Sequence, residues 1–179
     1  MPSARAILLS AAAAGTAALL LTGCSPTDPP AGLTGVSVAE DGTPLGVLLM
    51  CHDHVDGAVL HPSGRPPESG ETTGAWRHDG RVTGFTSWPL LPTSGAPAAE
   101  RWTTERETTR LDKGRSYRLY GGTADDSWST VPVEFTPEDL TRLKPGQVRY
   151  TLNDEIRTTS LDDFRDGACD EAAGGREEH

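Results

Sequence analysis

Apolar residues after position 33 recur mainly at every second position, in short runs that are separated by Gly, Pro, Asp or Asn. This spacing is typical of β-strands, whose side chains alternate between two faces. Residues 34–39 and 45–51 are the first two runs, and the turn-forming segment 40–43 between them predicts a hairpin. The run 45–51 is apolar at odd and at even positions, so we expect a central strand that is buried on both faces.

The same alternation predicts further strands along the chain. They are expected at 58–61, 72–78, 81–89, 101–109, 115–122, 128–135 and 147–152. Asp79-Gly80 predicts a tight hairpin turn, and the phase of the apolar residues that follow predicts a bulge near Gly84. The run 101–109 is polar on both faces, as an edge strand is, and Pro132 predicts an edge or bulged position in its strand.

Two short helices are expected near the C-terminus. Thr136 is suited to be the N-cap of the first, with Pro137 in its first turn, and residues 144–146 end it. The second is expected to span 160–167. Together the elements predict an all-β fold, namely an antiparallel β-sandwich or an open barrel, to which two short helices are added.

The first 23 residues have the composition of an export signal. A single basic residue, Arg5, precedes the apolar run 6–21, which is too short and too rich in alanine for a convincing membrane span. Leu21-Thr22-Gly23 then leads into Cys24. An ordinary secretory signal with a chance cysteine at its end is the alternative.

The segment Leu21-Thr22-Gly23-Cys24 resembles the lipobox of bacterial lipoproteins. The resemblance implies that the Cys24 thiol is diacylglycerylated, that the chain is cut just before it, and that the acyl chains anchor the protein to the outer face of the cell membrane. With the segment 144–147 and a cysteine near the C-terminus, the chain is similar to small lipoproteins of high-GC Gram-positive bacteria. No molecular function follows from that similarity.

Four regions are expected on this basis. They are a signal peptide at 1–23, the lipidated cysteine and a Pro-rich tether at 24–33, one β-sandwich domain at 34–169, and a disordered acidic tail at 170–179. Without the signal, 15 basic residues face 26 acidic ones, which gives a net charge of about −11. A chain of this charge without a basic stripe is not expected to bind nucleic acid.

Two cysteines remain once Cys24 is assigned to the anchor. Cys51 and Cys169 are an even pair in an exported chain, so they are expected to form a disulfide that closes a loop of 118 residues. Two unrelated buried thiols are the alternative. The four tryptophans are expected to pack in the core or at its rim.

His52 and His54 are the candidate metal ligands. On a strand, residues two apart share a face, so both rings could reach one transition-metal ion, with His61 or His78 as a third ligand. A polar strand end that leads into a turn is the alternative. No other cofactor is expected, and the sequence contains none of the common catalytic signatures.

These observations favour a non-catalytic binding or structural module on the cell surface. Its partner would be an envelope protein or a small ligand, of neutral or cationic character because the chain is acidic. Contacts are expected on the loops 62–70, 90–99 and 121–127. A metal-binding protein, or a hydrolase whose triad converges only in space, is the alternative function.

Overall fold

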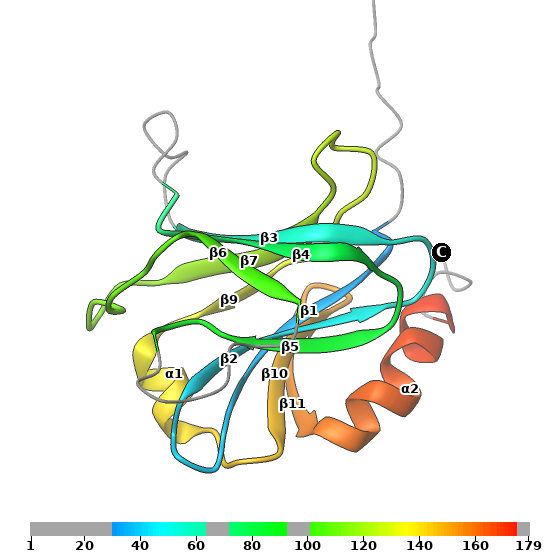
Figure 1. Ribbon diagram of the computed structural model, residues 1–179. Helices are drawn as coiled ribbons and strands as arrows, with labels where there is room; N and C mark the ends of the chain where they lie inside the picture. The colour runs from blue at the N-terminus through cyan, green and yellow to red at the C-terminus, as the bar shows by residue number, and fades with distance from the viewer. Residues whose placement is uncertain (1–29, 64–71, 93–100, 175–179) are drawn as a thin grey trace, which may run out of the picture.

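The computed structural model describes residues 30–63, 72–92 and 101–174, which form two β-sheets packed face to face (Figure 1). The first sheet has the order β11-β10-β1-β2-β5 and contains β1 (Gly32–Val38), β2 (Pro44–Met50), β5 (Phe85–Pro89), β10 (Gln147–Leu152) and β11 (Glu155–Ser160), with β8 (Thr130–Val131) beside β1. The second has the order β6-β4-β3-β7-β9 and contains β3 (Val55–Pro62), β4 (Gly74–Val82), β6 (Trp102–Arg106), β7 (Tyr117–Gly122) and β9 (Val133–Phe135). The predicted antiparallel β-sandwich is confirmed.

The strand β2 lies inside the first sheet and not at its edge. It pairs with β1 through the predicted hairpin and with β5 on its other side. Leu48 and Met50 belong to the core between the two sheets, whereas Val47 and Leu49 belong to a second core on the outer face of the first sheet. Burial on both faces, as the sequence predicts, is therefore confirmed.

The helix α2 (Leu161–Gly174) covers this outer face (Figure 1). Its buried residues are Phe164 and Ala168, and the ring of Phe164 lies 4.9 Å from that of Tyr150 on β10. The predicted end at Gly167 and the predicted disorder from Asp170 are wrong for residues 168–174, which continue the helix. Packing of this last turn against the sheet stabilises it, and the sequence pattern did not show that packing.

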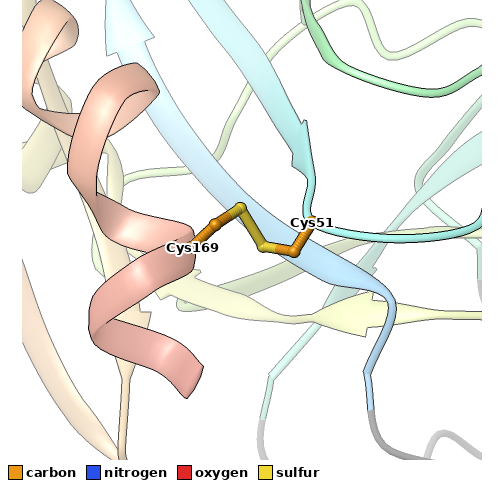
Figure 2. Close-up of a disulfide and its surroundings, with 2 residues drawn as sticks. All are labelled: Cys51 and Cys169. Atoms are coloured by element: carbon orange, nitrogen blue, oxygen red, sulfur yellow. A yellow bond between two sulfur atoms is a disulfide. The ribbon is translucent and has the colours of Figure 1, made fainter. Parts of the chain in front are cut away.

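A disulfide between Cys51 and Cys169 joins the end of β2 to α2, as predicted (Figure 2). The Cα atoms of the two cysteines lie 5.4 Å apart. Cys51 is exposed and Cys169 is half-buried against the second core. The bridge therefore fixes the last element of the fold to its central strand across 118 residues of sequence.

The predicted hairpin at Asp79-Gly80 is wrong. β4 continues through both residues, and its register with β3 shifts there, because Arg77 pairs with Gly57 and Val82 pairs with Val55. Gly80 has a φ of 90°, which glycine adopts without strain. The bulge therefore lies here and not near Gly84, which follows the end of β4, because β3 pairs with β4 on both sides of the shift, at Arg77 and at Val82.

Other predicted boundaries are refined by the packing. Pro132 divides one predicted strand into β8, which pairs with β1 in the first sheet, and β9, which pairs with β7 in the second. β1 begins at Gly32 instead of at residue 34, so residues 32 and 33, which were predicted to belong to the tether, belong to the sheet. β6 is an edge strand, as predicted.

The short helix α1 (Pro137–Arg142) begins as predicted. The Thr136 hydroxyl accepts a hydrogen bond from the Asp139 backbone N–H, and the Asp139 carboxylate accepts one from the Thr136 backbone N–H.

Three of the tryptophans, Trp76, Trp88 and Trp102, are buried between the sheets, with the rings of Trp88 and Trp102 stacked 4.4 Å apart. No helix in the described part of the chain is both long and apolar enough to cross a bilayer.

Candidate functional site

A cavity of about 200 Å³ lies on the outer face of the second sheet. Two rows of paired residues form its floor and walls: Ala75, Val59 and Tyr120 make one row, and Arg77, Gly57 and Gly122 make the other. Gly57 and Gly122 are direct neighbours across β3 and β7, and the surface is hollow between them because neither carries a side chain. The hollow is therefore a result of strand register.

Charged side chains border this cavity at one side. The Arg77 Nε atom donates to a Glu105 carboxylate oxygen at a distance of 2.6 Å, and this contact raises the pKa of the Arg77 guanidinium. Asp56 and Asp126 also line the cavity. One guanidinium and three carboxylates give the cavity wall a formal charge of −2, so it is electrostatically suited to a neutral or cationic group.

A second cavity of about 440 Å³ adjoins the first. The two share Asp56, Arg77, Thr123 and Ala124. The remaining wall of the second cavity consists of residues from the start of β3, the bulge of β4 and the loop after β7, namely His54, His78, Gly80, Arg81 and Asp125. The bulge at Gly80 thus shapes this part of the surface.

The loop after β7 lines both cavities, and it is internally bonded. Asp125 accepts hydrogen bonds from the Ser127 backbone N–H at 3.1 Å and from the Ser127 hydroxyl at 2.6 Å. The hydroxyls of Ser127 and Thr123 and the backbone N–H of Ser127 lower the pKa of the Asp125 carboxyl to about 2. The Asp125 carboxyl is therefore ionised at neutral pH. The Ala124 backbone N–H also donates to Asp56, which ties the loop to β3.

Of the three loops that the sequence predicts as contact sites, the structure describes one. Most of 62–70 and of 90–99 lies outside the described residues, so neither can be placed. The loop 121–127 is described, and five of its residues line the cavities: Gly122, Thr123, Ala124, Asp125 and Asp126. The structure therefore places this loop at the two cavities, and contacts through it stay a prediction.

His52 and His54 do not have the geometry that the metal prediction assumed. Residues 51–53 form a bend after β2 instead of a strand, and Asp53 has a left-handed φ of 51°. The His52 Nδ1 atom lies 2.8 Å from an Asp53 carboxylate oxygen, and its ring packs edge-on against Trp128. His54 lines the second cavity.

Within residues 30–63, 72–92 and 101–174, no group of three His, Cys, Asp or Glu side chains is arranged to hold a metal ion. Cys51 is in the disulfide and is not available as a thiolate ligand. Metal binding by His52 and His54 stays a prediction whose assumed strand geometry is not present. Cys24, the predicted lipidation site, lies outside the described residues.

The hydroxyl groups at the cavities hold the loop together. Thr123 accepts a hydrogen bond from the Trp128 backbone N–H at 3.0 Å, and its hydroxyl lies 3.2 Å from that of Ser127. Ser127 donates to Asp125. Each of these hydrogen bonds joins two residues of the segment 123–128, so together they fix the shape of the loop.

Sequence reasoning missed Arg77, Glu105, Tyr120 and the paired glycines as members of the site. Strand alternation places these side chains on the outward face, which is a signal available in the sequence. The contact between these residues depends on the register between β3, β4 and β7, and the bulge in β4 shifts that register.

Comparison of the chain with family models, with curated proteins and with solved structures found no match.

Proposed function

We propose that the chain is a lipid-anchored protein of the outer face of the cell membrane that displays a non-catalytic binding module. The anchor is supported by Leu21-Thr22-Gly23-Cys24 and the apolar run before it. Mass spectrometry of the mature protein should find diacylglycerol on Cys24 as the first residue. Cys24→Ala should leave the protein unprocessed or release it, and an unmodified N-terminus at another residue would contradict the anchor.

Binding is supported by one observation above all. Two adjoining cavities share one wall, and a loop whose own hydrogen bonds fix its shape lines both of them. A preformed concave site loses little entropy on binding, since its side chains are already ordered. The ligand class that fits is a small neutral or cationic molecule, or a peptide with such a side chain, because carboxylates outnumber the guanidinium around the first cavity.

Filling the cavity tests this proposal. Ala75 lies on its floor, so Ala75→Tyr would occupy the space with a residue that strands accommodate well. The matched control is Thr103→Tyr, on the neighbouring strand β6 opposite Arg77 and outside the cavity lining. Both variants should keep the melting temperature of the parent, because both positions face outward.

The probes are a panel of neutral saccharides, polyamines and short Lys- and Arg-containing peptides, added to the full mature chain. A compound that binds the native state raises its melting temperature. We expect at least one class to raise that temperature for the parent and for Thr103→Tyr but not for Ala75→Tyr. Equal shifts in all three proteins, or the absence of a shift with every class of compound, would contradict a binding site at these cavities.

A further inference from the structure

The first cavity presents an apolar row to a ligand. Ala75, Val59 and Tyr120 form this row, as direct neighbours across β4, β3 and β7 on the outer face of the second sheet, which is uppermost in Figure 1. The Tyr120 ring packs nearly parallel to the ring of His61, with 5.8 Å between the centroids, so its plane is fixed. An aromatic ring attracts weakly polarised C–H groups to its negative face. The apolar row therefore suits the C–H side of a small ring.

The guanidinium of Arg77 borders the cavity beside the apolar row, and a bulge in β6 brings its partner to it. Two successive residues of β4 pair with Arg106 and Thr104, so Glu105 between them has no direct partner on β4. The Glu105 carboxylate accepts a hydrogen bond from the Arg77 Nε–H, with 2.6 Å between the two atoms. No other hydrogen bond joins Arg77 to the described residues, so the donors on its two terminal nitrogens are open to a ligand.

Hydrogen-bond acceptors line the same cavity. The Asp56 carboxylate accepts a weak hydrogen bond from the Ala124 backbone N–H at 3.4 Å, and Asp126 is exposed on the loop after β7. A carboxylate only accepts hydrogen bonds, whereas a guanidinium only donates them. The cavity therefore presents both donors and acceptors beside one apolar row.

This combination of groups distinguishes between classes of ligand. An ammonium group only donates, so it would bond to the carboxylates but meet Arg77 as a like charge. A carboxylate or phosphate group only accepts, so it would bond to Arg77 but meet Asp56 and Asp126 as like charges. A zwitterion has both kinds of group, but it loses the hydration of two charges, and Glu105 already balances Arg77. A hydroxyl group donates and accepts without a charge, so it suits all of these residues.

We propose that the first cavity binds one ring of a neutral saccharide, with the C–H side of the ring on the apolar row and its hydroxyls toward Arg77 and Asp126. This inference rests on the proposed binding function and specifies its ligand class. Cavities for drug-sized ligands measure about 300 to 1,000 Å³, so a cavity of about 200 Å³ suits a single ring. The second cavity shares Arg77 with the first and is where a further, linked ring would extend.

Calorimetric titration of the full mature chain, in a detergent without a sugar head group, tests the ligand class. The probes are neutral mono- and disaccharides of hexoses and N-acetylhexosamines, with spermidine as the cationic and free alanine as the zwitterionic comparison. At least one saccharide should bind the parent. Its dissociation constant should stay nearly unchanged when the ionic strength rises from about 0.1 to about 1 M, because salt screens exposed charges and a hydroxyl has none.

Arg77→Met separates the ligand classes by the sign of its effect. Loss of the guanidinium donors should raise the dissociation constant of the saccharide about tenfold, whereas a cation in the same cavity would bind more tightly. The matched control is Arg118→Met, on the outer face of β7 and outside the cavity lining, and it should leave the dissociation constant unchanged. Tyr120→Val removes the ring but keeps a residue that strands favour, and it should raise the dissociation constant about fivefold.

The outcomes separate the ligand class from the binding function itself. Unchanged saccharide binding in Arg77→Met or Tyr120→Val, or an equal loss in Arg118→Met, would overturn the saccharide site. Binding of spermidine or alanine without any saccharide, abolished by Ala75→Tyr, would overturn the ligand class and leave the proposed function standing. Failure of every compound to bind would contradict the proposed function as well.

Discussion

Removal of the Cys51–Cys169 disulfide should lower the free energy of unfolding by about 4 to 5 kcal/mol. This magnitude follows from the chain-entropy model for a closed loop of 118 residues, since the bridge restricts the unfolded chain. The double variant Cys51→Ala, Cys169→Ala removes the bridge without leaving reactive thiols at either position. Urea unfolding of the full chain, followed by tryptophan fluorescence from the buried rings, measures the loss.

The loss should not be uniform across the molecule. α2 buries only Phe164 and Ala168, and Gly167 and several Asp residues give its sequence a low helix propensity. Without the bridge, we expect the amides of α2 to exchange with solvent well before those of β2 and β10. We expect this order of exchange because only two side chains of α2 are fully buried, whereas β2 is buried on both faces.

Reduction of the parent protein is the matched control, and it should reproduce the double variant in both measurements. The reasoning is refuted if the oxidised parent and the double variant differ by less than about 0.5 kcal/mol. It is equally refuted if the α2 amides of the double variant exchange as slowly as those of β2, because packing alone would then hold the helix.

Two further predictions concern the loop after β7 and the inner core. The Asp125 carboxyl should titrate with a pKa of about 2 by NMR. Because this folded-state pKa is below 3.8, the stabilisation from the ionised carboxylate is present above about pH 4 and is lost as the pH falls toward 2. Asp125→Asn should remove this acid dependence of stability, and a titration midpoint near 4 in the parent would contradict the bonded loop. Gly46→Ala should cost about 1 to 3 kcal/mol, because a Cβ atom there would lie 2.5 Å from the Trp88 ring. Gly84→Ala, whose Cβ would meet no atom within 4 Å, is the control in the same urea assay, and equal costs would refute the clash.

Features determined by local sequence were predictable. The two-sided apolar pattern of β2 identifies a central strand, and Thr136-Pro137 identifies the start of α1 through its own capping groups. Pairing of Cys51 with Cys169 followed from counting cysteines once Cys24 was assigned to the anchor. In the first two cases the residues that determine the structure are neighbours in the sequence. In the third, only two cysteines remain, so a single pairing is possible.

Features determined by tertiary contacts were not predictable. Asp79-Gly80 has the local chemistry of a turn, yet β3 pairs with β4 before these residues, at Arg77, and after them, at Val82, so they lie within one strand. β11 lacks the apolar alternation of a strand, because its edge position leaves both faces largely exposed. The candidate site has the same origin, since it depends on a register between strands that no single segment encodes.

The double-faced burial of β2 constrains the order in which the molecule can be completed. Among the residues that the structure describes, β2 is the second strand, whereas the helix that covers its outer face is the last element. In a chain that emerges N-terminus first, Val47 and Leu49 therefore stay exposed, and the Cys51 thiol stays unpaired, until α2 has emerged as well. A chain that is truncated before residue 161 would expose both an apolar sheet surface and a free thiol. Completion of the C-terminus thus protects the nascent domain against aggregation and against mispaired disulfides.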